Sequence, residues 1–423
     1  MRLLLIHQYF AGPSEPGGTR HYELASHLVR AGHDCTIVAS TMNYASGKRV
    51  VEGRGLVVEQ RIDGIRVLRA YTYPSLHRSF AWRVVALVSF MFTSVWAALR
   101  AKDIDLVMGT SPPLFQALSA WLVSAIRRRP LLLEIRDLWP EFAIDIGLLK
   151  NPIIIKLARW VEVFLYRRAT HLLVNSPAYR DYLLAKGVPD AKITVIANGV
   201  DPDMFTPEAD GKFFREEMGV TDKFVVTYAG ALGMANDIET ILRAAARLRT
   251  ETRVRFLLVG EGKDRPQLEA KAKELELGNL KFAGSRSKAE MRAVLAGSNI
   301  CLATLKNIPM FRTTYPNKVF DYMAAGRPTV LAIDGVIRQV VEAAGGGVFV
   351  EPGNDRALAA AIQSLCDDRE RCQAMGLAAR RYVVENFNRH RQAQDFVRLL
   401  ERLTNVPQTD HEPPVPEVRE TCV

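Results

Sequence analysis

The chain has 423 residues, of which 48% are hydrophobic, so it is long and apolar enough for two or three domains and is not a disordered tail or a linker. Its formal net charge of +10 predicts an anionic partner, which nucleic acid, an acidic membrane leaflet or a phosphorylated small molecule could supply. The five cysteines form no CxxC pair and accompany no metal-like histidine cluster, which indicates reduced thiols in the cytoplasm and argues against a disulfide framework, a zinc site or another cofactor metal.

The first apolar run, residues 1–6, is too short for the core of a secretory signal and predicts a buried strand at residues 3–6, so we expect no export. A long loop follows and ends at the glycine pair Gly17 and Gly18, before a helix predicted over residues 19–30. Glycines at this point let backbone amides approach an anionic ligand, and Arg20 adds a positive charge. A turn that binds no ligand is the alternative.

Apolar runs of strand length alternate with amphipathic helical patterns in both halves of the chain, which is typical of parallel βαβ units. In the first half we predict strands at residues 3–6, 36–39, 105–108, 131–135, 171–175 and 193–196. In the second half we predict strands at residues 224–228, 255–259, 280–282, 300–303, 329–332 and 347–350. The fold class is therefore α/β, with two successive doubly wound parallel sheets.

Residues 84–99 form an uncharged segment that includes Phe92 and Trp96 and has arginines before and after it. As a helix of sixteen residues the segment would be about 24 Å long, which is short of a hydrocarbon core of roughly 30 Å. We therefore expect a buried helix of an α/β domain and not a membrane span. The alternative is a helix that docks on an anionic membrane surface through its flanking arginines.

Residues 134–141 place several charges beside Trp139 at the end of a predicted strand. Open α/β sheets bind ligands outside the carboxyl ends of their strands, so this loop is a candidate for chemistry. Asp137 could accept a proton from a substrate hydroxyl or stabilise a developing positive charge. A structural pair of Arg136 with Asp137 is the alternative.

The stretch 198–207 contains a glycine and two prolines and interrupts the apolar periodicity, which indicates a hinge between the two units. After the next predicted strand, Gly230 and Gly233 lie in a loop that could hold phosphates. The loop has the spacing of neither a dinucleotide fingerprint nor a P-loop, so neither is predicted.

A helix predicted to begin at Asn317 carries the most informative residues of the chain. Lys318 and Asp321 are three positions apart and so share one helical face. If Asn317 caps the helix, the helix start and Lys318 together suit a diphosphate, and Asp321 could accept hydrogen bonds from ribose hydroxyls. An ordinary surface charge pair at a solvated helix start is the alternative.

Taken together, five segments resemble glycosyltransferase family 4 of the GT-B fold, and more narrowly its WbuB-like branch, which builds bacterial surface polysaccharides. The segments are the glycine pair with its helix and residues 134–141, 198–207, 259–262 and 316–328. The resemblance implies two Rossmann-like domains that face each other across a cleft. It also implies transfer of a sugar, usually from a UDP-sugar, with retention of anomeric configuration and without a metal or other cofactor.

On this resemblance we expect an acceptor-binding domain at residues 1–197, a hinge at 198–207 and a nucleotide-sugar-binding domain at 208–386. A helix at 387–404 would cross back to the first domain, and residues 405–423 would form a disordered tail. The helix predicted at residues 391–403 would thereby gain a partner for its apolar face.

The sequence departs from the family pattern in three places. Thr313 stands where many members have the first of two acids spaced eight apart, while Asp321 stands where the ribose-binding acid lies. Ala231 and Asn236 occupy a loop where the wider family has an arginine and a lysine. Lys318 is therefore the first candidate for the phosphate charge.

Arg312 and Arg20 are the supporting candidates for that charge, and Asp137 stands in place of a cleft histidine. We expect a glycosyltransferase on the cytoplasmic face of the inner membrane, acting on a lipid-linked or polysaccharide acceptor in surface-polysaccharide synthesis. A non-hydrolysing nucleotide-sugar 2-epimerase and a degenerate protein that only binds nucleotide sugars are the alternatives. A nucleic-acid partner is least favoured, because no basic and aromatic interleaving typical of such modules is present.

Overall fold

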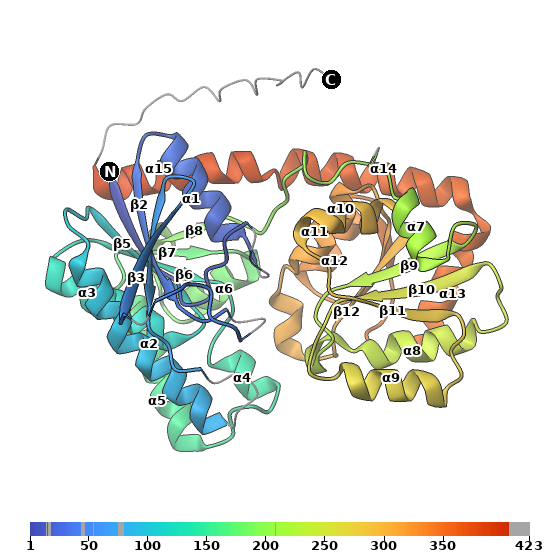
Figure 1. The fold of residues 1–423 in the computed structure, drawn as a ribbon, viewed down its shortest axis with the longest axis horizontal. Helices are drawn as coiled ribbons and strands as arrows, with labels where there is room; N and C mark the ends of the chain where they lie inside the picture. The colour runs from blue at the N-terminus through green and yellow to red at the C-terminus, as the bar shows by residue number, and fades with distance from the viewer. Residues whose placement is uncertain are drawn as a thin grey trace.

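The computed structural model describes residues 1–13, 15, 18–43, 47–53, 55–74, 80–207 and 209–405. Gly17 and the predicted tail beyond residue 405 lie outside the described residues. Two α/β domains lie side by side, and two long C-terminal helices, α14 (Arg369–Asn386) and α15 (Arg389–Thr404), run along one side of both (Figure 1).

The first domain contains an eight-stranded sheet of order β3-β4-β2-β1-β5-β6-β7-β8. Its strands are β1 (Arg2–Ile6), β2 (Asp34–Ser40), β3 (Val57–Ile62), β4 (Ile65–Ala70), β5 (Leu106–Ser111), β6 (Leu131–Ile135), β7 (His171–Val174) and β8 (Ile193–Val195). Every strand is parallel to its neighbours except β3, which pairs antiparallel with β4. The predicted parallel sheet therefore has one antiparallel strand at this edge, and the sequence pattern predicted neither β3 nor β4.

The hairpin β3–β4 has a turn sequence that predicts it, although the apolar periodicity did not indicate these two strands. Asp63 and Gly64 join the two strands, and both have positive φ angles, of 46° and 81°. An Asp-Gly pair with this backbone favours a tight two-residue hairpin. The turn accounts for the reversal of direction at the sheet edge.

The second domain contains a wholly parallel six-stranded sheet of order β11-β10-β9-β12-β13-β14. Its strands are β9 (Phe224–Ala229), β10 (Val254–Val259), β11 (Leu280–Gly284), β12 (Ile300–Thr304), β13 (Thr329–Ala332) and β14 (Gly347–Phe349). Each predicted strand of this half is present, with ends that differ by at most two residues. The two-domain α/β prediction is confirmed.

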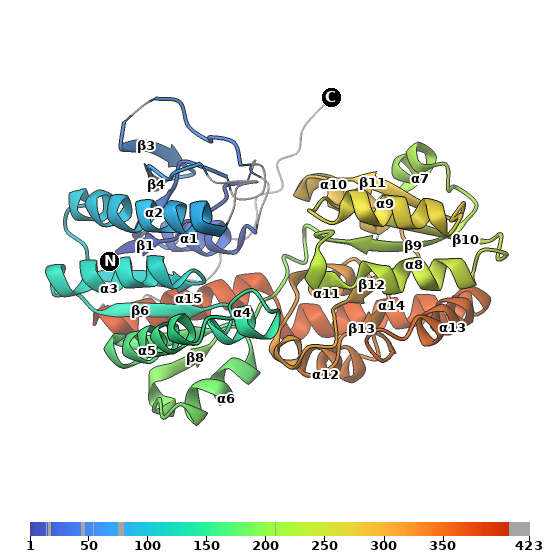
Figure 2. The same cartoon turned by 90° about the horizontal axis from the view of Figure 1, so that it is seen from below.

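Alternate residues of each central strand pack into different layers, as the two-residue period of a strand requires. In β1, Leu3 and Leu5 pack with α1 (Arg20–Arg30) and α15, whereas Leu4 and Ile6 pack on the opposite face. That opposite face is covered by α2 (Phe80–Arg100), α3 (Leu114–Arg127) and α5 (Pro152–Arg168), as Figure 2 shows. Both faces of the sheet are therefore buried.

The second sheet is covered on both faces in the same way. One layer contains α8 (Ile238–Arg247), α9 (Arg265–Glu274) and α13 (Asp355–Asp367). The other contains α7 (Lys212–Met218), α10 (Lys288–Ala296), α11 (Asn317–Ala324), α12 (Val336–Ala343) and α14. The short helices α4 (Glu141–Asp145) and α6 (Pro177–Ala185) belong to the first domain.

The chain crosses back to the first domain between α14 and α15. The amide of Val200 donates to the carbonyl of Phe387 over 3.0 Å, and the amide of Arg389 donates to the carbonyl of Val200 over 2.9 Å. Phe396 and Leu400 of α15 then join the core beneath α1. The apolar face of the C-terminal helix has the partner that the resemblance implied.

Helix α2 is longer than the segment predicted from the sequence. It contains 21 residues and is about 31 Å long, so its residues Trp82–Arg100 meet the length and composition expected of a membrane span. One side of α2, including Phe90 and Ala97, is buried against the sheet, while Phe92 and Trp96 are exposed. The expected burial of this helix thus holds for one side only. That side packs against the sheet, so α2 is part of the folded α/β domain.

Candidate functional site

A cleft of about 810 Å³ separates the two domains at the carboxyl ends of several strands. In parallel α/β sheets ligands bind at this end. The lining comes from both domains, the linker and α15, and includes Gly18, Thr19, Arg20, Glu23, Gly199, Asp201, Gly230, Gly260, Lys288, Asn317, Lys318, Asp321 and Arg389. Five of the predicted donor-binding residues that the structure describes therefore meet in one cavity: Gly18, Gly230, Asn317, Lys318 and Asp321.

Lys318 lies on the first turn of α11 and reaches the loop after β9. Its Nζ donates to Tyr228 Oη over 2.9 Å and to Asn236 Oδ1 over 3.0 Å, and lies 4.3 Å from the centre of the Tyr228 ring. Burial lowers the pKa of Lys318 to about 7, since an enclosed ammonium loses hydration. An anionic ligand would favour the protonated form of Lys318 and would then be bound by an ammonium that is already in position.

The glycine at position 230 makes room for this lysine. A Cβ built on Gly230 would lie 2.8 Å from Lys318 Nζ and 3.1 Å from Tyr228 Oη. The hydroxyl of Tyr322, which also belongs to α11, accepts from the Ala229 amide and donates to the Ala229 carbonyl, each over 2.9 Å. These contacts fix α11 against the end of β9.

Asp321 lies one turn further along α11 and faces the same cavity. Burial raises its pKa to about 7, while Lys288 and Arg389 act in the opposite direction and Glu23 acts in the same direction as burial. A carboxyl group in this environment can accept hydrogen bonds from ligand hydroxyls in place of water. The predicted contact of Asp321 with a ribose stays a prediction.

Asn317 lines the cleft but does not cap α11. Pro316 occupies the N-cap position and Asn317 is the first helical residue, with no side-chain cap hydrogen bond. The predicted capping role is wrong because the helix begins at Asn317, so the cap position falls on the proline before it. The side chain of Asn317 is exposed at the cleft.

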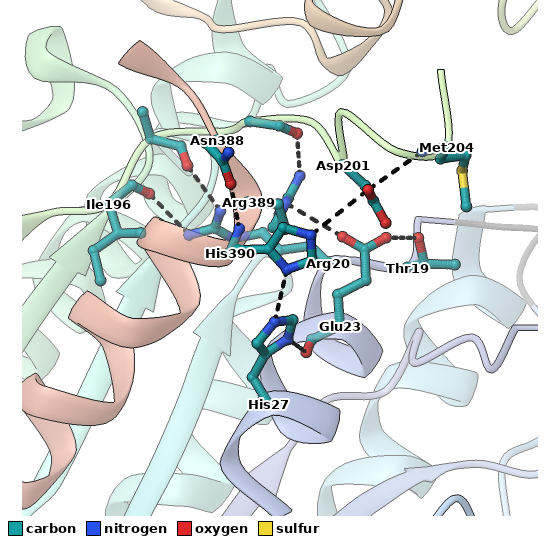
Figure 3. Close-up of polar contacts among 12 residues, drawn as sticks. Thr19, Arg20, Glu23, His27, Ile196, Asp201, Met204, Asn388, Arg389 and His390 are labelled. Carbon is teal, nitrogen blue, oxygen red and sulfur yellow. Dashed lines mark hydrogen bonds and ion pairs between the residues drawn. The ribbon is translucent and has the colours of Figure 1, made fainter. Parts of the chain in front are cut away.

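The guanidinium of Arg20 binds other groups of the protein, whereas the sequence predicted that it supports a bound phosphate. Its guanidinium donates to Glu134 Oε1 over 3.1 Å and to the carbonyls of Ile196 and Ala197 over 2.8 and 3.0 Å. Figure 3 shows this side chain between α1 and the chain that leads into the linker. Arg20 therefore holds α1 against β6 and against the end of the first domain, just before the linker.

Glu23 is the residue at which both domains and α15 meet, and the sequence alone did not reveal it. Its carboxylate accepts from Thr19 Oγ1 and, over 2.8 Å, from Lys288 Nζ, and lies 3.2 Å from Arg389 Nε (Figure 3). Burial opposes ionisation, but Arg389 and Lys288 lower the pKa of Glu23 to about 2. Lys288 belongs to the second domain, so this contact crosses the cleft.

Asp137 follows the carboxyl end of β6, outside the lining of the cleft. Burial raises its pKa to about 6, and the neighbouring Arg136 acts in the opposite direction. The carboxylate predicted to face the cleft is therefore not part of the lining that the described residues form, and its predicted role at the acceptor side stays a prediction.

Arg312 is also separate from the cleft. It is 55% exposed, lies 3.7 Å from Asp334, and lines a small hollow beside Phe311. The predicted support for Lys318 is wrong in this structure, because the short helical turn Pro309–Thr313 directs Arg312 toward Asp334.

Thr313, which stands in place of a family acid, joins the two domains. Its hydroxyl donates to the carbonyl of Met310 over 2.6 Å, and its own carbonyl accepts from Ser176 Oγ over 2.6 Å. Asn198 makes a similar contact with the carbonyl of Tyr315 over 2.8 Å. The loop before α11 is thus held against the first domain.

Within the described ranges, one group of side chains could share a metal ion: Asp201, Asp203 and His390. His390 Nε2 lies 3.8 Å from Asp201 and 3.5 Å from Asp203, and its other ring nitrogen is 3.1 Å from His27 Nε2 (Figure 3). An imidazole can contact both carboxylates directly, so this grouping by itself does not require a metal.

Two family models match the chain. The Glycosyl transferase 4-like domain matches residues 17–199, and the Glycosyl transferases group 1 domain matches residues 223–368. The chain is 25% identical to the putative colanic acid biosynthesis glycosyl transferase WcaI of Escherichia coli K12, over 81% of this chain and 86% of that protein. It is 26% identical to the GDP-mannose-dependent alpha-mannosyltransferase of Mycobacterium tuberculosis, over 86% of each.

Solved structures show the same fold. HepE of Anabaena in complex with UDP has a TM-score of 0.70 at 20% identity, covering 95% of this chain and 100% of that one. WaaG, described as a glycosyltransferase involved in lipopolysaccharide biosynthesis, has a TM-score of 0.68 at 15% identity, covering 94% and 99%. At these identities the likeness concerns the fold alone.

Proposed function

We infer the function from the premise that this chain belongs to glycosyltransferase family 4 and has the GT-B fold. We propose that it transfers a sugar from a nucleotide diphosphate to a lipid-linked or growing polysaccharide acceptor. UDP is the first candidate for the nucleotide. The transfer would retain the anomeric configuration and would serve surface-polysaccharide synthesis at the cytoplasmic face of the inner membrane. The narrower WbuB-like assignment is part of this proposal.

The position of Lys318 carries the proposal. Its ammonium lies at the start of α11, beside the loop of Gly230, where the cleft is lined by groups from both domains. A diphosphate placed there would favour the charged form of Lys318 and would also meet the positive end of a helix. Asp321, one turn away, would accept hydrogen bonds from the ribose.

The same arrangement would promote departure of the nucleotide. Negative charge grows on the leaving phosphate oxygen as the sugar bond breaks, and a preorganised cation stabilises that charge more than it stabilises the ground state. We propose that Lys318 and the helix start supply this stabilisation without a metal or other cofactor. Asp137 is the proposed acceptor-side base, which requires the cleft to close further over the acceptor.

The similar proteins differ in the nucleotide of the sugar donor that their names mention. HepE has structures with UDP and with UDP-glucose, whereas the mycobacterial relative is named for GDP-mannose. UDP is our first candidate, because the family resemblance usually implies a UDP-sugar.

A thermal-shift screen of UDP- and GDP-sugars tests the donor, because a ligand that binds the native state raises Tm in proportion to the logarithm of its concentration over Kd. Transfer is then measured with membrane-extracted lipid acceptors, with and without a chelator, and the anomeric configuration of the product is determined by NMR. Lack of any shift by either nucleotide class, or activity that disappears with the chelator and returns with magnesium, would contradict the proposal. Release of a free epimerised nucleotide sugar would instead identify an epimerase.

A further inference from the structure

Exposed apolar side chains gather on one face of the first domain. Among the described residues, sixteen large hydrophobic side chains are exposed, and eleven of these fall between positions 82 and 160. Phe92, Ile153 and Trp160 are 67%, 77% and 63% exposed. Scattered exposed apolar residues are normal in soluble proteins, but a concentration of this kind marks an interaction surface.

The helices that carry these residues are neighbours. α2, α3 and α5 lie side by side on the face of the sheet opposite α1 and α15, as Figures 1 and 2 both show. Their inner sides supply Phe90, Ala120 and Leu165 to the core. We call their outer side the outer helix face and define it by Phe92, Trp96, Ile126, Ile153, Leu157 and Trp160.

The exposed charges on α2, α3 and α5 themselves are all positive. α2 and α3 contain no aspartate or glutamate, and the single acid of α5, Glu162, is buried and binds Tyr166, Tyr182 and Lys186. The exposed cations on these helices and directly after α3 include Arg83, Arg100, Arg128, Arg129, Lys156 and Arg168. An apolar centre with a basic rim complements an anionic surface that offers an apolar interior.

We propose that the outer helix face docks on an anionic lipid bilayer, with α5 and α2 lying in the plane of the interface. Aromatic side chains such as Trp96 and Trp160 suit the headgroup level, and the guanidinium of Arg100 lies 4.7 Å from the Trp96 ring, where both can meet headgroups. Spanning by α2 alone is excluded by its packing, because its inner side closes the core of the sheet.

This inference rests on the proposed function in one respect, which is the reason for docking. α4 and Leu148 connect the loop of Asp137 to the start of α5, so a docked face would place the acceptor side of the enzyme beside the lipid surface. A lipid-linked acceptor could then reach the first domain without leaving the bilayer.

The test uses the full chain and co-sedimentation with vesicles of phosphatidylcholine alone or mixed with phosphatidylglycerol. The double variant Ile153→Asp/Trp160→Asp should weaken binding to the anionic vesicles by about tenfold or more, since it removes two apolar anchors and adds two negative charges. Phe213→Asp is the matched control, because Phe213 is 74% exposed on α7 of the second domain. It should bind like the unmodified protein, and neutral vesicles should bind weakly.

Separate readouts distinguish the failure of this inference from the failure of the proposed function. The double variant should keep the thermal shift caused by the nucleotide sugar, because the substituted residues lie outside the cleft lining. Vesicle binding that is unchanged in the double variant, equally reduced in Phe213→Asp, or equally strong on neutral vesicles would overturn the inference. Dissociation of a dimer by the double variant, with vesicle binding unchanged, would assign the face to contact between two copies.

Discussion

Lys318 combines a pKa lowered to about 7 by burial with hydrogen bonds to neutral oxygens of Tyr228 and Asn236 in place of a carboxylate. A lysine bound to a carboxylate would have its charge already neutralised. Lys318 is instead available to an anionic ligand at modest cost.

Replacement of Lys318 by alanine should therefore weaken donor binding or abolish turnover. Charge-assisted hydrogen bonds contribute about 1.5–3 kcal/mol, so we expect donor Kd to rise about 10- to 150-fold, measured by titration calorimetry. Lys273→Ala is the control, because Lys273 lies on the exposed side of α9, and it should leave the donor Kd unchanged. Unchanged donor affinity in Lys318→Ala would remove this residue from the site.

Asp321→Asn should stabilise the ligand-free enzyme in a pH-dependent way. The folded pKa of Asp321 is raised from 3.8 to about 7, so the stability that its protonated form contributes is fully present below pH 3.8 and is lost as pH rises through 7. Asparagine avoids this loss and should add about 1–2 kcal/mol at pH 8 but little at pH 4, measured by urea unfolding. The same variant should bind the donor less well; equal stability at both pH values would contradict the assignment.

At the scale of single residues, the sequence located what depends on near neighbours. Lys318 and Asp321 share a helical face because of their spacing, and Gly230 follows a strand, so all three could be placed in advance. Arg312 could not, because its direction depends on a turn that pairs it with Asp334.

At the scale of elements, the crossing between α14 and α15 depends on a close backbone contact. A Cβ on Gly199 would lie 2.3 Å from the carbonyl oxygen of Phe387 and 2.4 Å from Gln392 Oε1. The linker and the helix crossing therefore tolerate no side chain at this point.

Gly199→Ala should lower the free energy of unfolding by about 1–3 kcal/mol or more, because the clash involves backbone atoms. Thermal and urea unfolding of the variant measure the loss. Gly278→Ala is the matched control, since nothing lies within 4 Å of its added methyl group. A Gly199→Ala protein as stable as the control would show that the linker can shift freely.

At the scale of the whole molecule, Lys288 holds the cleft partly closed by reaching Thr19 and Glu23 of the other domain over 2.8 Å each. The depressed pKa of Glu23 means that this contribution to stability is present above its usual pKa of 4.5 and is lost as pH falls toward 2. Ligand entry must compete with this contact.

Lys288→Ala should open the ligand-free enzyme, with a larger radius of gyration in small-angle X-ray scattering and a loss of about 1 kcal/mol in stability at pH 7. The unmodified protein should show a similar opening as the pH falls from the usual carboxyl pKa toward the lowered pKa of Glu23. A radius that is insensitive to both changes would mean that other contacts set the distance between the domains.

The sequence by itself determined the alternation of strands and helices, the two α/β units and the residues of α11, because each depends on periodicity or spacing within a few turns of chain. Only the tertiary structure decided that Glu23, Lys288 and Arg389 meet, since they lie far apart in the sequence and are brought together by strand order and by the return of α15. The outer helix face was decided in the same way, because a single apolar helix shows its exposed side only when its neighbours are in place.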